Sequence, residues 1–352
     1  MRALPEGERP WCSGVAVAAG TGSGPLVEDA FGWAVRYEVY DESADRGVEL
    51  PREERVPVRT GRRHGTVFDL ASLTKLFTTI VAVRAVERGQ IDLDGRVASY
   101  APELTAAAEH GVTVRQLLTH TSGLLPELPL YEYADDEQRL ARLSAEPPTT
   151  PPGAARRYSD LNFLLLQRVL EHACRRTLDR LVGDTITGPL GMADTRFRPP
   201  SSWLPRIAAT EDQRRPWARL DRGMLRGVVH DENAWALGGV AGHAGLFSTA
   251  GDLAVLCRAL LRGGGGVVSS ASVDLLLNAP GLGFEVDQPW FMGELAGRGA
   301  AGHTGFTGTS LVVDRARDVY LVLLANTVHP RRRPGNSAPR AAAGTALAGA
   351  VG

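Results

Sequence analysis

Segments that favour β-strands lie at both ends of the chain, and a mostly helical stretch separates them. Residues 13–40 form two apolar runs around a glycine-rich turn, and β-rich runs return at 282–325. Strands at both ends with helices between them predict one antiparallel sheet closed by the two ends, with the helical part inserted. We therefore expect an α/β (α+β) fold in a single domain, with an α/β part at 1–92 and 236–330, a helical part at 93–235, and a C-terminal helix or tail at 331–352.

Length and charge exclude several classes of partner. The chain has 352 residues, with 39 basic and 40 acidic side chains and a formal net charge of −1. With this balance the chain has no overall positive electrostatic field that would attract a polyanion, so we expect no nucleic-acid partner. No run of about 18 apolar residues is present, and charges and prolines occupy the first twelve residues where a signal peptide needs an apolar stretch. We expect a cytoplasmic protein without a membrane partner; its oligomeric state stays open.

Three cysteines, Cys12, Cys174 and Cys257, lie far apart and form no CxxC pair. Neither a disulfide framework nor a zinc site is indicated, so we expect no metal.

Lys75 is the single lysine of the chain, because the other 38 basic residues are arginine. A desolvated lysine can lose its proton and act as a base, whereas arginine keeps its proton. Apolar residues recur at helical spacing after Lys75, and Gly89 is a candidate helix cap. Ser72 precedes Lys75 by three residues, so a helix would place the hydroxyl and the amine on one face, with roughly 5–6 Å between their Cβ atoms. If Ser72 opens that helix, its N–H is a free donor for an oxyanion.

Two further segments carry polar groups that could reach a cleft. Tyr158 follows a Pro-Pro-Gly turn and precedes an apolar helical run, so its phenol can point away from the helix. His303, Thr304 and Gly305 lie in the first of several β-rich runs near the C-terminus, where small residues would let a substrate lie along the backbone. The cleft between the two parts of the fold is where all these segments can meet.

The chain resembles the penicillin-recognising serine hydrolases, meaning class C-type β-lactamases, DD-peptidases (penicillin-binding proteins) and their esterase and transacylase relatives. The resemblance covers about residues 13 to 330. Its elements, in chain order, are Ser72-Leu73-Thr74-Lys75, LLTHTSGL at 117–124, Tyr158-Ser159-Asp160, PLGMADTRF at 189–197, GGVAGHAGLFSTAGDLA at 238–254 and His303-Thr304-Gly305. It implies the β-lactamase/transpeptidase-like fold.

The resemblance also implies roles for the residues. Ser72 would attack an acyl carbonyl and form an ester intermediate, while Lys75 and Tyr158 would share the proton transfers. The backbone N–H groups of Ser72 and Phe306 would hold the oxyanion, and His303, Thr304 and Gly305 would line the substrate site. No cofactor is implied, and the partner is a small-molecule acyl substrate.

Two departures from the family pattern bear on the substrate. His303 stands where β-lactam- and peptide-binding members usually have lysine, and imidazole is mostly uncharged at neutral pH. Asp160 stands where they usually carry an amide. Asp160 could pair with Lys75, which would favour the ammonium form and leave proton abstraction to Tyr158. Its negative charge would also repel an anionic substrate. We therefore expect neutral esters or amides to be preferred, with weak β-lactamase or DD-peptidase activity allowed.

Three functions remain open from the sequence. The first is an esterase- or amidase-like hydrolase; the second is an acyltransferase with the same residues; the third is a non-catalytic, penicillin-binding sensor-like domain. Partition between water and another acceptor depends on the shape of the pocket, so the sequence does not separate the first two.

Three other motifs have simpler explanations. The glycines at 20–24 are followed by a strand pattern, which predicts a hairpin turn in place of a dinucleotide loop. His230, Asp231 and Glu232 are adjacent in sequence and lack metal-ligand spacing. His120 follows a short helical run, and we expect it to hold the turn there by hydrogen bonds.

Overall fold

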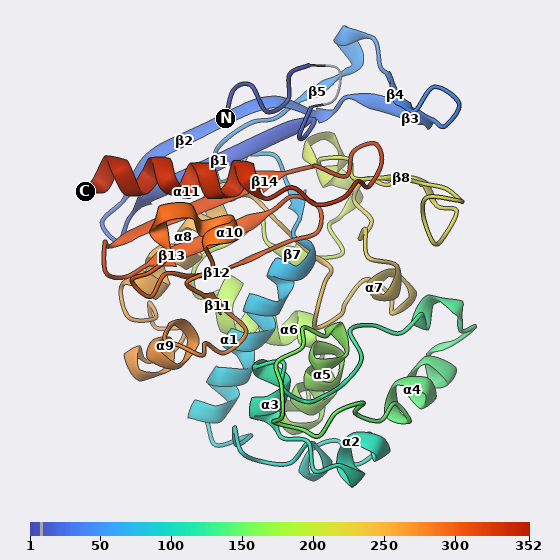
Figure 1. Ribbon diagram of the computed structural model, residues 1–352, viewed down its shortest axis with the longest axis vertical. Helices are drawn as coiled ribbons and strands as arrows, with labels where there is room; N and C mark the ends of the chain where they lie inside the picture. Colours follow the sequence, from blue (N-terminus) through green and yellow to red (C-terminus); the bar gives the residue numbers. More distant parts are fainter. Residues whose placement is uncertain (8–9) are drawn as a thin grey trace.

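One antiparallel sheet forms the centre of the molecule (Figure 1). The computed structural model describes residues 1–7 and 10–352, and within them this sheet has seven strands in the order β11-β12-β13-β14-β1-β2-β5. β1 pairs with β2 on one side and with β14 on the other, which confirms the predicted closure by the two ends of the chain. The strands are β1 (Gly14–Thr21), β2 (Pro25–Val35), β5 (Val56–Pro57), β11 (Glu285–Val286), β12 (Ala301–Thr304), β13 (Ser310–Asp314) and β14 (Val319–Ala325).

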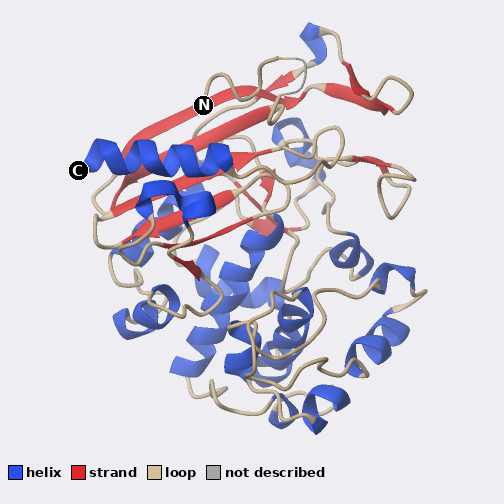
Figure 2. Cartoon of the chain, in the orientation of Figure 1, coloured by secondary structure: helices blue, strands red, loops and turns tan. Residues whose placement is uncertain are grey.

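Each face of the sheet is covered by helices, as Figure 2 shows. In β1, Val15 and Val17 pack in an apolar cluster with residues of α10 (Pro289–Met292) and α11 (Ala338–Val351). Ala16 and Ala18 point the other way into the main core, which includes α8 (Ala250–Leu261). Because neighbouring side chains of a strand alternate between faces, both faces of the sheet are apolar and buried.

Helix α1 (Thr74–Glu87) runs from the sheet into the helical part of the molecule (Figure 1). Its residues are almost all buried, as expected for a helix that is apolar on every side. Gly89, the predicted C-terminal cap, follows the end of this helix and has a φ of +66°. The N–H groups of Gly89 and Gln90 donate to Val86 O and Ala85 O, each over 2.9 Å, which is the Schellman pattern of a helix C-terminus.

The segment 93–235 is helical in its first two thirds and mixed afterwards. Four prolines between 199 and 216 interrupt helix formation there, and short strands occur in their place. The remaining helices are α2 (Thr105–Glu109), α3 (Val114–Leu118), α4 (Asp136–Ser144), α5 (Asp160–Cys174), α6 (Leu178–Val182), α7 (Glu232–Ala236) and α9 (Ser270–Leu277). The short strands pair as β6-β10-β7, β3-β4 and β8-β9, with bounds β3 (Tyr37–Asp41), β4 (Arg46–Glu49), β6 (Phe68–Asp69), β7 (Arg196–Phe197), β8 (Asp212–Gln213), β9 (Gly223–Met224) and β10 (Leu246–Ser248).

The helices of residues 1–7 and 10–352 differ from membrane-spanning helices. None of the helices there combines the length and the apolar character that crossing a bilayer requires.

Candidate active site

Ser72 lies in a short connection between β6 and α1. This connection is a 3₁₀ turn, Ala71–Leu73, so the α-helix begins two residues after Ser72 and the expectation that Ser72 opens the helix is wrong in detail. Ala71 has a φ of +46°, which is strained for a residue with a side chain. The carboxylate of Asp69 stabilises this bend by accepting from the Ala71 N–H over 2.9 Å. The turn presents the Ser72 hydroxyl to the cavity described below.

Lys75 is completely buried beside Ser72. Its Nζ lies 3.0 Å from Ser72 Oγ, 2.8 Å from Asp160 Oδ1 and 3.3 Å from the carbonyl oxygen of His243. Burial alone lowers the pKa of Lys75, but the Asp160 carboxylate and the nearby Tyr158 outweigh burial and raise it above its usual value. Lys75 therefore carries a positive charge at neutral pH, and the pairing with Asp160 that the sequence allowed is present.

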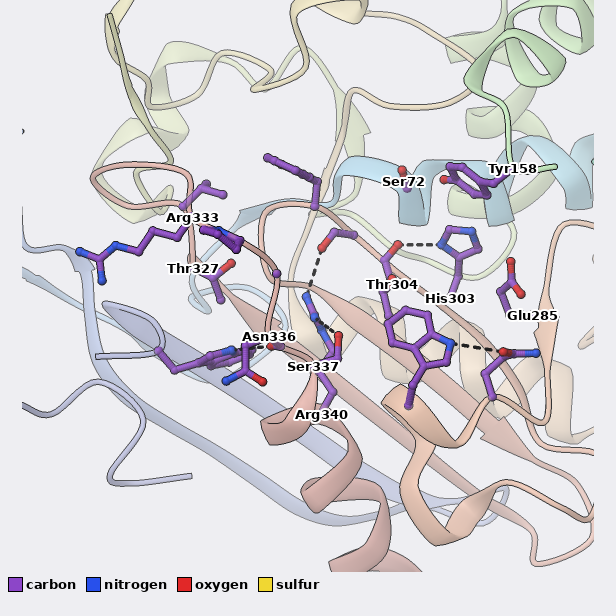
Figure 3. Close-up of a pocket in the computed structure, with 18 of the residues that line it drawn as sticks. Ser72, Tyr158, Glu285, His303, Thr304, Thr327, Arg333, Asn336, Ser337 and Arg340 are labelled. Carbon is purple, nitrogen blue, oxygen red and sulfur yellow. Dashed lines mark hydrogen bonds between the residues drawn. The ribbon is translucent and has the colours of Figure 1, made fainter. Parts of the chain in front are cut away.

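Tyr158 stands over this pair from the loop before α5. Its ring centroid is 4.8 Å from Lys75 Nζ, and its hydroxyl points toward Ser72 in Figure 3. Burial raises the pKa of Tyr158, although Lys75 and a hydrogen bond with Ser72 act in the opposite direction. The phenol thus keeps its proton at neutral pH and can both give and accept a proton.

His120 holds the Tyr158 loop, in agreement with its predicted structural role. Its Nδ1 accepts from the Ser159 N–H and from the Asn162 side chain, each over 3.1 Å, and its ring packs 4.6 Å from that of Tyr158. Burial keeps the pKa of His120 well below its usual value, so the ring is neutral. Asn162 was not found from the sequence, because one asparagine in an apolar helix gives no functional signal.

His303 and Thr304 lie at the end of β12. The neighbouring strand β11 pairs only with Ala301 and Gly302, so the outer edge of β12 has no strand partner at His303 among the described residues. His303 Nδ1 donates to Thr304 O over 2.7 Å, which leaves Nε2 as the acceptor of this ring. Burial and the charge of Lys75 lower the pKa of His303 to about 4, so it is uncharged at neutral pH.

Gly305 continues the chain into a turn that packs against the Ser72 connection. A Cβ at Gly305 would lie 2.1 Å from Thr309 Oγ1 and 2.4 Å from Leu70 O, so only glycine fits. Thr309 Oγ1 in turn donates to Leu70 O over 3.0 Å, and Thr307 Oγ1 donates to Asp69 O over 2.7 Å. These contacts fix the turn against the residues that precede the serine.

The backbone amides of Ser72 and Phe306 are placed to meet a ligand. Both residues line one cavity, and neither amide donates to another group in the described part of the chain. The Phe306 side chain is 58% exposed and stacks on His230, with 5.5 Å between ring centroids.

This cavity has a volume of about 650 Å³ and combines aromatic walls with arginines. Besides the motif residues, its walls include Trp11 from the N-terminal segment and residues 333–340 that lead into α11. These contributors were not predictable from the sequence, since they come from segments near both termini and carry no motif. The further polar and aromatic lining residues are Arg156, Glu285, Gln288, Trp290, Thr327, Arg333, Asn336, Ser337 and Arg340.

Among the described residues, Asp160, Asp231 and His243 form a group with the spacing of metal ligands, with donor atoms within 4.8 Å of one another. Each carboxylate also has a partner within the protein. Lys75 contacts Asp160, and His243 Nε2 lies 3.0 Å from Asp231 Oδ1. Burial lowers the pKa of His243, but the Asp231 carboxylate outweighs burial and raises that pKa.

A serine beside a buried lysine and a tyrosine, in a cavity at the end of an antiparallel sheet, defines a serine-hydrolase type of site. Residues 5–345 match the family model described as Beta-lactamase, and the chain belongs to this family of serine hydrolases.

Individual relatives agree with this assignment. An Escherichia coli K12 protein provisionally named D-alanyl-D-alanine carboxypeptidase is 34% identical over 315 residues, which cover 77% of this chain and 72% of that protein. The structure of a class C β-lactamase from Rhodobacter sphaeroides superposes with a TM-score of 0.71 at 22% identity, over 96% of this chain and 95% of that one. A penicillin-binding protein homologue from Caulobacter crescentus gives a TM-score of 0.70 at 23% identity, over 96% and 92%. These two structures support the fold.

Proposed function

We propose that the protein hydrolyses small esters or amides through a covalent acyl-enzyme on Ser72. One observation carries the proposal: the Ser72 hydroxyl lies 3.0 Å from the buried Lys75 ammonium, with the Tyr158 phenol directed at the same hydroxyl. A serine hydroxyl is a weak nucleophile unless neighbouring groups take its proton and stabilise its charge. Tyr158 can take the proton, and Lys75 can stabilise the charge.

The charge states assign different tasks to Tyr158 and Lys75. As Ser72 Oγ bonds to the acyl carbon, Tyr158 accepts the serine proton and passes its own proton to the leaving oxygen or nitrogen, which departs as alcohol or amine. Lys75 stays an ammonium and stabilises the negative charge on Ser72 Oγ. In the second half, water attacks the ester, its proton moves through Tyr158 to Ser72 Oγ, and the acid product leaves.

The amides of Ser72 and Phe306 hold the oxyanion of both tetrahedral intermediates. Donors that are already oriented cost no reorganisation during the reaction, and each is worth about 3 kcal/mol in comparable enzymes.

Labelling with a fluorophosphonate, followed by intact-mass analysis, tests the nucleophile. We expect one adduct on the wild-type protein and none on Ser72→Ala, while the exposed Ser201→Ala serves as a matched serine control that is labelled normally. Turnover of p-nitrophenyl acetate should be lost in parallel. Labelling of Ser72→Ala to the wild-type extent would remove Ser72 from this role.

A narrower candidate is the hydrolysis of peptides that end in D-alanine. The cavity is lined by three arginines and one glutamate, Glu285, which is paired with Arg156. The negative charge of Asp160, which the sequence suggested would repel anions, is compensated by Lys75 at 2.8 Å. We propose on this basis that substrates with a carboxylate are accepted, and the name of the Escherichia coli relative supports it.

Kinetics with matched substrates test this narrower candidate. A p-nitrophenyl ester with a free carboxylate should be hydrolysed at least as efficiently as the neutral acetate, and its advantage should decrease as salt is added. An acylated D-alanyl-D-alanine peptide should release D-alanine. A strong preference for the neutral ester at low salt would restrict the function to neutral acyl groups.

A further inference from the structure

Arg340 is a buried cation in the wall of the cavity that the proposed mechanism does not use. It lies in the first turn of α11 and is 7% exposed. Among the acidic residues that the structure describes, none forms an ion pair with it. A buried charge without a counter-ion is costly, so its retention needs a reason in its surroundings.

The guanidinium of Arg340 contacts neutral groups. Its Nη2 donates to Gly305 O over 3.2 Å, its Nη1 donates to Ser337 Oγ over 3.0 Å, and its Cζ lies 5.6 Å from the centroid of the Trp11 ring. Gly305 O also accepts from the Gly308 N–H over 3.1 Å, so both lone pairs of this carbonyl are used. Burial lowers the pKa of Arg340 to about 10, which leaves it charged at neutral pH.

The carbonyl of Gly305 and the amide of Phe306 belong to the same peptide group. This peptide is trans, so its C=O and its N–H point in opposite directions. The carbonyl end is directed at Arg340. In Figure 3, Thr304, the last residue of β12, lies between Ser72 and Arg340, so an N–H that points away from Arg340 is directed to the side of Ser72.

We propose that Arg340 is a positioning residue that orients and polarises the Gly305–Phe306 peptide, so that the Phe306 N–H acts as a preorganised oxyanion donor. This inference rests on the proposed acyl-enzyme function and extends it to a residue more than 260 positions from the nucleophile. A cation at the carbonyl oxygen draws electron density through the peptide and makes the N–H a stronger donor. Its positive charge is not cancelled by a carboxylate, so its field also favours an oxyanion on the far side of the peptide.

Direct binding of a substrate anion by Arg340 is the competing explanation. Its two terminal nitrogens are already engaged, and its Nε is buried and has no partner within the described chain. Little guanidinium surface is left for a ligand. The contacts of Arg340 therefore favour action through the peptide.

Removing the guanidinium and adding it back tests the proposal. In Arg340→Ala, we expect kcat for p-nitrophenyl acetate to fall about 10- to 100-fold with KM unchanged, less than the loss of a whole oxyanion donor because the N–H is still present. Millimolar guanidinium should restore at least a third of the lost activity. The exposed Arg262→Ala, at the end of α8, is the matched control and should behave as wild type with and without guanidinium.

The outcomes separate three explanations. An equal loss of kcat for the neutral ester and for a carboxylate-bearing ester, with guanidinium rescue, supports the positioning role. A rise in KM confined to the carboxylate-bearing ester would overturn it in favour of substrate binding. Lost activity with a lowered melting temperature and no rescue would also overturn it. Arg340→Lys with wild-type kcat would support it, because lysine keeps a positive charge near the carbonyl oxygen of Gly305. Absence of a Ser72 adduct on the wild-type protein would instead overturn the proposed function itself.

Discussion

Two buried cations flank the catalytic cavity, and their surroundings differ. Lys75 has the Asp160 carboxylate at 2.8 Å, so the pair is close to neutral as a unit. Arg340 is surrounded by a carbonyl, a hydroxyl and an aromatic ring, and its charge is left uncompensated. When one member of the Lys75–Asp160 pair is substituted, the other member keeps its charge without a partner. When Arg340 is substituted, only neutral groups remain.

This difference separates a charge whose pKa depends on one neighbouring carboxylate from a charge that no neighbouring carboxylate compensates. Burial lowers the pKa of Lys75 and Asp160 raises it, so a single substitution at Asp160 can shift it. Arg340, with its pKa lowered to about 10 by burial, is charged at neutral pH, which suits a constant field at the oxyanion site. The comparison therefore predicts different responses to mutation and to pH in the two regions.

The largest effect is expected from Lys75→Met. The substitution removes the positive charge beside Ser72, and we expect kcat/KM for p-nitrophenyl acetate to fall on the order of 10³-fold. The lone Asp160 carboxylate, 24% exposed, should lower the free energy of unfolding by about 2 kcal/mol, as measured by urea denaturation. The double variant Lys75→Met/Asp160→Asn should recover that stability but not the activity. Activity retained in Lys75→Met would contradict the electrostatic role of the ammonium.

A smaller effect, on the pH profile, is expected from Asp160→Asn. Asp160 raises the pKa of Lys75, so its removal lowers this pKa and the ammonium is lost at a lower pH. The alkaline limb of the kcat/KM profile should therefore move to lower pH. Arg340→Ala should leave this limb in place. Higher activity of Asp160→Asn at pH 7 would show that the free amine, and not the ammonium, is the active form.

The smallest effect is expected on the stability of Arg340→Met. The change removes a buried charge that has no counter-ion and leaves no acid behind, so the free energy of unfolding should stay within about 1 kcal/mol of wild type or rise. Urea denaturation at neutral pH measures this free energy, with Lys75→Met measured in parallel. A decrease in the free energy of unfolding as large as that of Lys75→Met would contradict the proposed difference between a compensated and an uncompensated charge.

The sheet and the central motif residues could be predicted because local patterns encode them. Alternating and continuous apolar runs at both chain ends specified the strands, and the i, i+3 spacing of Ser72 and Lys75 specified their proximity. The strained turn at Ala71 was not predictable, because its φ of +46° is imposed by Asp69 and by packing around the turn.

Trp11, Asn162 and Arg340 were missed for a related reason. Each acts through a partner that is distant in the sequence, such as Asn336 for Trp11, His120 for Asn162 and Gly305 for Arg340. The expectation that neutral substrates are preferred was based on His303 and Asp160 considered without their neighbours. The fold adds Lys75 beside Asp160 and arginines around the cavity, and these neighbours change the expected electrostatics.

The position of β14 beside β1 has a consequence for biosynthesis. β1 pairs with β2 soon after both are made, but its other neighbour ends near residue 325, so the middle of the sheet cannot close before that residue has been translated. The turn that follows β12 and Arg340 in α11 are also translated late. A nascent chain would carry its nucleophilic serine without an assembled oxyanion site until β14 and α11 had been translated, so acylating activity should appear only after that point.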